Sequence, residues 1–170
     1  MTVAIKPIHV QVSQRVTGKT RTMDWNHYRF RSVWDLPAEP ADVFATLERA
    51  EDYPLWWSQV REATPLDERR GTARFRSLLP YDLFVTATAL RRDTEAGVLE
   101  IAMSGDLEGW VRWTVRAHEG GTRALYEQGV DVCKPLLRRF ALVGRPVFLV
   151  NHALMMRGGR RGLVAHLRRR

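Results

Sequence analysis

The chain has 170 residues, of which 45% are hydrophobic, so it can form one domain with a packed core but is too short for two. Its net charge is +8, but its 24 Arg and 3 Lys are spread along the chain without alternating with aromatic residues, which disfavours nucleic-acid binding. The single cysteine, Cys133, excludes disulfides within the chain and disfavours a zinc site built from thiolates.

Residues 1–25 combine a short alternating stretch, "IHVQV", with the polar run "SQRVTGKTRT", which predicts an N-terminal arm or an extra edge strand. They lack the continuous apolar core of a signal peptide. The longest apolar stretch, residues 140–156, is interrupted by polar residues that include Asn151 and His152, whereas a membrane span needs about 20 predominantly apolar residues. We therefore expect a cytoplasmic protein without a membrane span.

From residue 26 the pattern becomes regular. The segment "HYRFRSVWDLP" alternates, with Phe30 and Trp34 on its apolar face, and predicts a half-buried strand. The segment "PAEPADVFATLERAEDYPLWW" predicts two short helices, with Pro40 in the first turn of one and Pro54 dividing it from the other. Six strand-like segments follow, at residues 60–66, 72–79, 82–91, 98–104, 109–116 and 122–132. Short turn sequences such as "DERRG" and "GDLEG" join them, which predicts an antiparallel meander.

The last predicted element is a long amphipathic helix at residues 135–168. At 100° per residue, its apolar stripe is centred on Asn151 and comprises Phe140, Gly144, Val147, Phe148, Asn151, Leu154, Met155, Gly158 and Gly162. Pro146 removes one backbone hydrogen bond, which predicts a kink or break near residues 144–146. Because the small residues of the stripe leave space beneath the helix, we expect a cavity between it and the sheet.

The order of these elements resembles the helix-grip fold of the START and pollen-allergen-like (SRPBCC) superfamily. In this α+β fold a curved antiparallel sheet wraps around a long C-terminal helix, with two short helices after the first strand. Six segments carry the resemblance and are similar to the polyketide cyclase/dehydrase branch: "LPAEPADVFATL", "EDYPLWWSQV", "LPYDL", "GDLEGWVRW", "GTRALYEQGV" and "NHALMMRGGRRGL". The resemblance covers residues 26–168, which are therefore expected to form a ligand-binding domain.

The resemblance implies a deep apolar cavity for an aromatic, lipid-like or polyketide-like molecule. It supplies no catalytic signature, and fold alone does not determine function. Two functions therefore stay open. One is an aromatase/cyclase-type enzyme that steers aldol condensation and dehydration, and the other is a carrier or sensor without catalysis.

The candidate ligand-binding residues lie on the expected concave face of the sheet and on the helix stripe. They are Phe30, Trp34, Trp113, Tyr126, Val147, Phe148, Asn151 and Met155. The candidate catalytic residues are Asn151, whose amide can hydrogen-bond a ligand carbonyl, and His152, whose reference pKa near 6.5 suits a general acid or base. The structural alternative is a core amide satisfied by the backbone and a histidine at the boundary.

The register of one strand bears on this site. Trp113 alternates in step with Val111 and Val115, which places Arg112 on the outer face, whereas a shift by one residue would turn Arg112 inward. The segment "GDLEG" is interpreted as a tight hairpin turn. The alternative is a pair of carboxylates, Asp106 and Glu108, at the mouth of the cavity.

No metal site or cofactor is predicted. Adjacent helix residues such as Asn151 and His152 point about 100° apart and cannot hold one ion together. The sequence contains no serine elbow, phosphate-binding loop or nucleotide fingerprint. The expected partner is a hydrophobic small molecule, with at most weak contact between the basic "RRR" terminus and acidic surfaces. The chain is expected to be a monomer or a homodimer.

Overall fold

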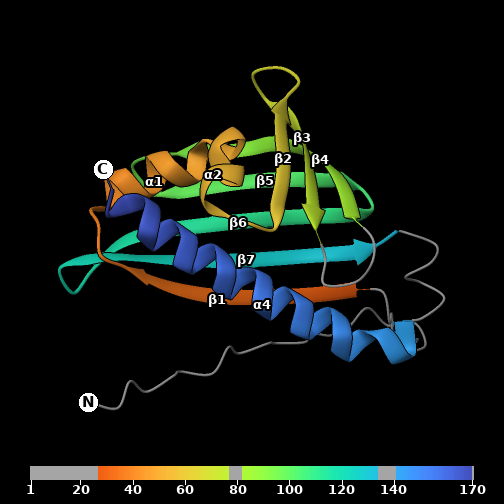
Figure 1. Ribbon diagram of the computed structural model, residues 1–170. Helices are drawn as coiled ribbons and strands as arrows, with labels where there is room; N and C mark the ends of the chain where they lie inside the picture. Colours follow the sequence, from red (N-terminus) through yellow and green to blue (C-terminus); the bar gives the residue numbers. More distant parts are fainter. Residues whose placement is uncertain (1–26, 77–81, 134–140, 170) are drawn as a thin grey trace, which may run out of the picture.

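A single curved sheet forms the body of the protein. The computed structural model describes residues 27–76, 82–133 and 141–169 (Figure 1). The strands are β1 (His27–Leu36), β2 (Val60–Pro65), β3 (Arg70–Arg76), β4 (Asp82–Asp93), β5 (Val98–Gly105), β6 (Leu107–His118) and β7 (Gly121–Val132). All neighbouring pairs are antiparallel, in the order β1-β7-β6-β5-β4-β3-β2. The predicted strand and six-strand meander are confirmed, and residues 1–25 lie outside the described part.

The alternation read from the sequence divides the sheet into two faces. Along β1, Phe30 and Trp34 are buried whereas Arg31 and Asp35 are exposed. The whole of β1 pairs with β7, from His27 opposite Asp131 to Leu36 opposite Thr122. Because successive side chains point to opposite faces of a strand, this pairing places the buried residues of both strands on the same concave side.

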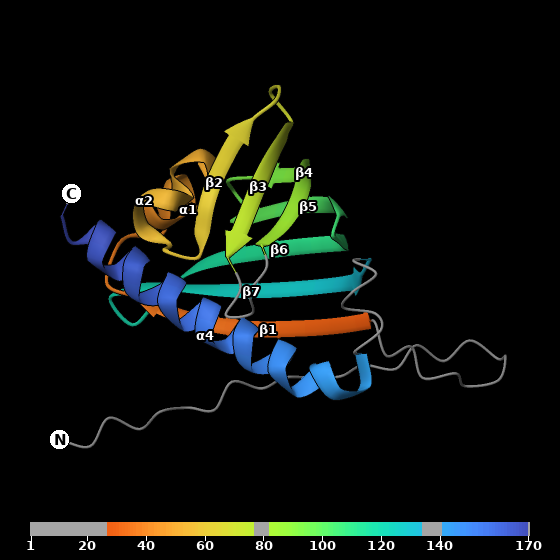
Figure 2. The ribbon, with the colours of Figure 1, turned by 45° about the vertical axis from the view of Figure 1, so that its right-hand side comes forward.

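Three short helical segments follow β1: α1 (Pro40–Glu48), the 3-10 helix η1 (Ala50–Asp52) and α2 (Tyr53–Trp56). Pro40 begins α1. The N–H that proline lacks would have no acceptor within the helix at this first position, so the helix loses no hydrogen bond. The Tyr53 hydroxyl donates a 2.6 Å hydrogen bond to the carbonyl of Leu47 and so ties α2 back to α1. Figure 2 shows α1 and α2 together at one end of the sheet.

The long helix α4 (Ala141–Leu167) crosses the concave face of the sheet diagonally (Figures 1 and 2). The helix runs through Pro146 without interruption, so of the predicted kink or break the break is wrong, and the kink stays a prediction. A proline inside a helix removes one hydrogen bond, but its fixed φ is itself helical, and the bonds of the neighbouring residues are enough to continue the helix here. No helix in the described ranges is long and apolar enough to cross a membrane.

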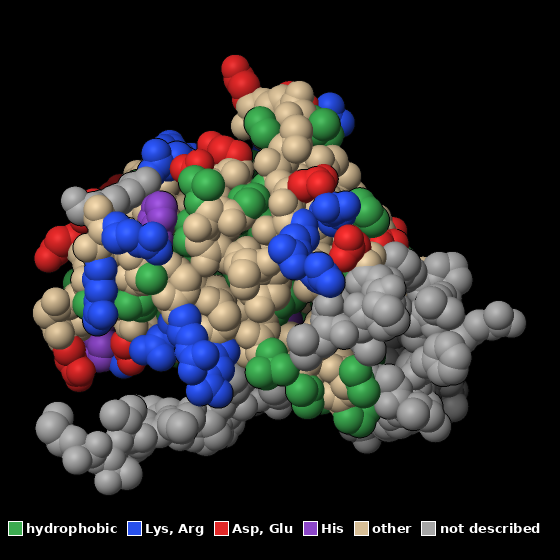
Figure 3. Space-filling model, in the orientation of Figure 1, with side chains coloured by type: hydrophobic (Ala, Val, Ile, Leu, Met, Phe, Trp, Pro, Cys, Tyr) green, Lys and Arg blue, Asp and Glu red, His purple; other side chains and the backbone are tan. Residues whose placement is uncertain are grey.

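The predicted inward stripe of α4 is partly wrong. Val147 and Leu154 are each 44% exposed, whereas Met156 and Leu163, which were not part of the stripe, are almost fully buried. The buried face is thus rotated by about one residue position from Asn151 toward His152. Apolar side chains consequently lie exposed over the N-terminal half of α4 in Figure 3, and basic side chains over its C-terminal half. Phe140 and Gly144 fall outside the part whose side chains are described.

The contact between α2 and α4 explains this rotation. Gly159 lies against the indole of Trp57, and Gly162 lies against the backbone carbonyl of Trp56. The indole N–H of Trp57 also donates a 3.0 Å hydrogen bond to the carbonyl of Met155. Because only glycines allow so close an approach, these contacts fix which side of α4 faces inward.

Candidate ligand-binding site

A cavity of about 330 Å³ lies between the concave face of the sheet and α4. Most of its wall is apolar and comes from strands β3 to β7. Representative residues of this wall are Phe75, Leu83, Ala87, Ile101, Met103 and Val111. A cavity of this size with an apolar wall and few polar groups is typical of small-molecule sites.

Most of the predicted ligand-binding residues line this cavity. They are Phe30, Trp113, Tyr126, Phe148, Asn151 and Met155, and the candidate catalytic residue His152 lines it as well. Two do not. Trp34 is only 2% exposed but lies behind the wall, with its ring edge-on to Trp57 and Trp113 at centroid distances of 5.7 and 4.8 Å. Val147 points away from the cavity because of the rotation of α4.

Gln128 connects the polar side chains of the wall. Its Oε1 accepts a 2.9 Å hydrogen bond from the Tyr126 hydroxyl and lies 3.1 Å from Nε2 of His152. With Oε1 as the acceptor, Nε2 of His152 carries the proton. Gln128 is only 7% exposed, and an amide buried without partners would cost on the order of 1–3 kcal/mol. These two contacts therefore hold the amide in place and orient both rings.

His152 is held as a neutral ring. Its imidazole stacks on Phe30 at a centroid distance of 3.6 Å and an interplanar angle of 13°. Burial among these groups lowers the pKa of His152 from 6.5 to about 3. Burial also raises the pKa of Tyr126 well above its ordinary value, so its hydroxyl keeps its proton. At neutral pH the cluster of Tyr126, Gln128 and His152 can exchange hydrogen bonds with a ligand but carries no charge.

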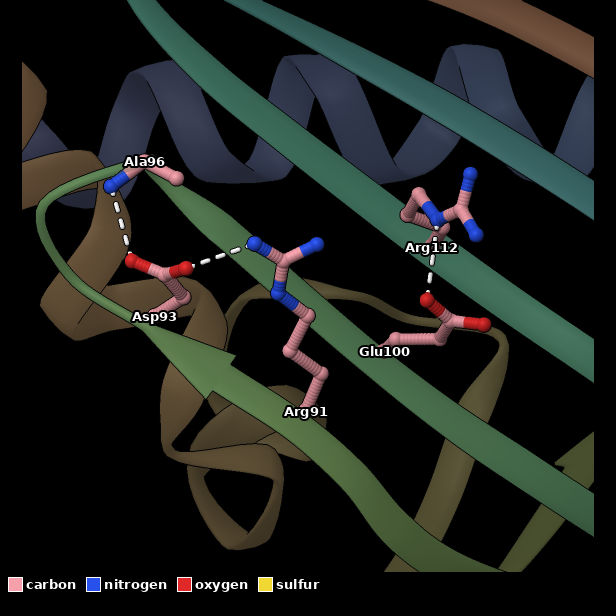
Figure 4. A network of polar contacts seen from close by, with 5 residues as sticks. All are labelled: Arg91, Asp93, Ala96, Glu100 and Arg112. Carbon is pink, nitrogen blue, oxygen red and sulfur yellow. Dashed lines mark hydrogen bonds and ion pairs between the residues drawn. The ribbon is translucent and has the colours of Figure 1, made fainter.

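Arg112 lies on the outer face, as the register predicted. Trp113 is 5% exposed and faces the cavity, whereas Arg112 donates a 3.0 Å hydrogen bond to Glu100 and stacks over Trp110. Figure 4 shows Arg112 and Glu100 on the side of the sheet away from α4, beside a second network in which Asp93 joins Arg91 to the backbone of Ala96. Arg112 is therefore not available to polarise a ligand inside the cavity.

The segment "GDLEG" contains the turn between β5 and β6, as predicted: Gly105 ends β5, Asp106 lies between the strands and Leu107 begins β6. Asp106 makes two hydrogen bonds to Phe84 of β4, each of 3.0 Å. Its backbone N–H donates to the carbonyl of Phe84, and its carboxylate accepts from the N–H of Phe84. Neither Asp106 nor Glu108 lines the cavity. The described ranges contain no cluster of three or more His, Cys, Asp or Glu suited to a metal ion.

An ion pair stands at one end of the cavity. Arg92 of β4 pairs with Glu48 of α1, and both residues line the cavity. A bulge between Ala89 and Arg91 shifts the register of β4 against β5 just before this pair. Bulges bend a strand and redirect its side chains, so the bulge helps to bring Arg92 to the cavity, whose charged lining also includes Glu68, Arg91 and Glu100.

Gln128, which organises the polar cluster, was not among the residues predicted from the sequence. Its signal was present, because Gln128 follows Tyr126 by two residues and must share its face of β7. Trp57, which lines the cavity and donates a hydrogen bond to α4, was not predicted either. Trp57 lies beyond the end of α2, where neither helical nor strand periodicity indicates which way a side chain points.

Comparisons with known proteins agree with this geometry. The family model described as polyketide cyclase / dehydrase and lipid transport matches residues 36–148. The search of curated proteins gave no match. Among solved structures, the Zhui aromatase/cyclase from a Streptomyces species aligns with a TM-score of 0.70 at 9% identity, over 85% of this chain and 95% of that one.

Two further structures share the fold. A START superfamily protein from Mycobacterium smegmatis has a TM-score of 0.68 at 10% identity, over 83% of this chain and 97% of that one. The di-domain ARO/CYC protein BexL has a TM-score of 0.64 at 13% identity, over 85% of this chain and 51% of that one. At identities this low, the structural similarity shows the fold alone. The family follows from the family model, which matches more than half of the chain. The chain therefore belongs to the polyketide cyclase/dehydrase and lipid transport family, with the helix-grip fold of the START superfamily.

Proposed function

We propose that this protein binds a largely apolar small molecule in the cavity beneath α4 and acts as a carrier or sensor. The observation that carries the proposal is the cavity itself: about 330 Å³ of space with a mainly apolar wall, an uncharged polar cluster at Gln128 and charged side chains such as the Arg92–Glu48 pair. The cluster fits a ligand that presents one or two carbonyl or hydroxyl oxygens to the Gln128 side of the wall. Aromatic, lipid-like and polyketide-like molecules all fit this description.

The electrostatics of His152 favour binding over proton transfer. A general acid or base works best when its pKa lies near the working pH, and a pKa of about 3 leaves the imidazole neutral and weakly basic at pH 7. A neutral ring stacked on Phe30 is instead well suited to orient a ligand.

Filling the cavity tests the proposal. The inward-facing Ala87 of β4 is replaced by Phe, which should weaken binding of the neutral fluorescent ligand N-phenyl-1-naphthylamine at least about tenfold, because the added ring occupies the space that the ligand needs. Binding is measured by fluorescence titration. The control is Thr88→Phe at the next position, on the opposite face of the same strand, which should bind as the wild type does. Equal affinities in all three proteins would refute the proposal.

A second candidate function is an aromatase/cyclase. The joined cluster of Tyr126, Gln128 and His152 favours it, together with Asn151 on the same wall. A base would remove a proton from a methylene carbon between two ketones, and that carbon would attack a distant ketone to form a carbon–carbon bond. This attack would close the ring; the protonated base would return its proton to the alkoxide, and loss of water would then give the unsaturated ring. The cluster and the apolar wall would hold the chain folded for this attack.

Separate replacements of Asn151 and His152 by Ala distinguish the two functions. The assay follows cyclisation of a poly-β-keto thioester by absorbance and its binding by calorimetry. A carrier should show no wild-type turnover, and each variant should lose roughly three- to tenfold in affinity. An enzyme should turn over, and the variants should lose turnover while keeping their affinity.

A further inference from the structure

A second, more polar cleft lies next to the cavity, between the start of β2, the end of β3 and the middle of α4. It encloses about 220 Å³, and its residues are Ser58, Gln59, Arg61, Arg76, Asn151, Leu154 and Met155. Asn151 and Met155 line both the cleft and the cavity. These two residues are one helical turn apart on the same side of α4, so the two hollows adjoin each other across their side chains.

The local structure of β2 and β3 brings two arginines to this cleft. The register between the strands shifts between Val60 and Glu62, which makes Arg61 the bulged residue of β2. The N–H of Arg76 donates a 2.8 Å hydrogen bond to the carbonyl of Gln59, which places the end of β3 beside the start of β2. Since a bulge redirects its side chain, Arg61 and Arg76 line the same hollow although they belong to different strands.

The two arginines of the cleft are not in ion pairs with the nearest carboxylates, which pair with Arg74 instead. The carboxylates of Glu62 and Asp82 lie 2.8 and 3.7 Å from the guanidinium of Arg74, which engages both. In the part of the chain that the structure describes, no ion pair involves Arg61 or Arg76, and no acidic residue lines the cleft. Asp82 lies opposite Arg76 in the β3–β4 pairing, but its carboxylate pairs with Arg74. Two guanidinium groups outside any described ion pair form a site for an anionic oxygen group, because their N–H donors match the geometry of carboxylates and phosphates.

Neutral donors complete the cleft. The Ser58 hydroxyl donates a 3.1 Å hydrogen bond to Oε1 of Gln59, which directs the Gln59 amide. The Gln59 side chain lies against the backbone of α4 at Gly158, where an added Cβ would come within 2.8 Å of Oε1. The absence of a side chain at Gly158 therefore lets Gln59 reach the helix at this point.

We propose that this cleft binds the anionic head, a carboxylate or a phosphate, of an amphiphilic ligand whose apolar body occupies the cavity. The proposal rests on the proposed function and narrows it to one class of ligand, an apolar molecule with a negatively charged end. Arg61 and Arg76 bind the head, and Asn151 and Met155 lie where head and body join.

The test compares three molecules with the same ten-carbon body: decan-1-ol, decanoate and decyl phosphate. Each competes with N-phenyl-1-naphthylamine for the wild-type protein. We expect the two anions to displace it at roughly five- to tenfold lower concentration than decan-1-ol, and added salt to reduce this advantage. Whichever anion displaces it better identifies the head as carboxylate or phosphate.

The double variant R61Q/R76Q should bring the anions to within about twofold of decan-1-ol without changing the affinity for decan-1-ol. The matched control is Arg31→Gln, an equal charge change on the exposed face of β1 at the opposite edge of the sheet, which should keep the advantage. An equal affinity of the wild type for all three molecules would overturn the proposal, as would an unchanged advantage in R61Q/R76Q.

The two proposals fail in different ways. If neither N-phenyl-1-naphthylamine nor decan-1-ol binds, the proposed function fails. Direct calorimetry of decanoate with the wild type and with R61Q/R76Q then still tests the cleft, and binding that persists unchanged in the double variant counts against it. If decan-1-ol binds as well as the anions do, the cavity stands and the anion site is wrong.

Discussion

Replacing Gly162 with Ala is expected to destabilise the protein by about 2 kcal/mol or more. A Cβ at this position would overlap the backbone carbonyl oxygen of Trp56, which a side-chain rotation cannot move away. Relief would require α4 to shift from α2, which would weaken the contacts of Gly159 and Leu163 as well. Overpacking in a well-packed core costs roughly 1–3 kcal/mol or more, which exceeds the roughly 1 kcal/mol that Ala gains over Gly in a helix.

The measurement is urea unfolding followed by circular dichroism, with Gly158→Ala in the same helix as the matched control. At Gly158 the added Cβ meets only the end of the Gln59 side chain, which can rotate away. The higher helix propensity of Ala should therefore keep that variant within about 1 kcal/mol of the wild type. If both variants had the same stability, the close contact of α2 and α4 would not hold the helix.

The second large effect is a loss of folding stability at acidic pH. Burial lowers the pKa of His152 to about 3 in the folded protein, whereas the unfolded chain has the ordinary value of 6.5. Between these values the unfolded state binds a proton that the folded state does not, so the free energy of unfolding decreases as the pH falls from 6.5 to 3. The loss at pH 3 is on the order of 4–5 kcal/mol, and by pH 4.5 it is roughly 2–3 kcal/mol.

His152→Phe should remove this contribution, because Phe can keep the stacking on Phe30 and cannot take up a proton. Unfolding free energies are measured for both proteins at several values between pH 7 and pH 4.5. Acidic groups outside the cavity affect both proteins equally and cancel in the difference. We expect the variant to gain roughly 2–3 kcal/mol relative to the wild type over this range, whereas parallel curves would show that His152 is not held neutral by burial.

Strand alternation and turn chemistry are local, which is why the sequence predicted the sheet well. The alternation of Trp113 with Val111 and Val115 sufficed to place Arg112 outside. The same period places Gln128 on the face of Tyr126, and the polar cluster was therefore within reach of sequence reasoning. The lowered pKa of His152 could not be predicted from the sequence, because it depends on how completely other elements bury the ring.

The rotation of α4 and the polar cleft could not be predicted, because both depend on contacts between distant segments. Hydrophobicity placed Val147 and Leu154 inside, but the approach of Trp56 and Trp57 to the helix glycines turned the buried face toward His152. The bulge at Arg61 likewise has no sequence signature, since it arises from the register between β2 and β3.

Because the interior contains a cavity, the sequence is constrained differently at the helix contacts and at the cavity wall. Where α2 meets α4, atoms touch closely and position 162 has no room for a larger residue. Around the empty space, a side chain need only be apolar, since no neighbour across the gap must match its shape. The residues that line the cavity can therefore change to suit a different ligand without disturbing the contacts that hold the fold together. This explains how the same fold occurs in sequences that share only about a tenth of their residues.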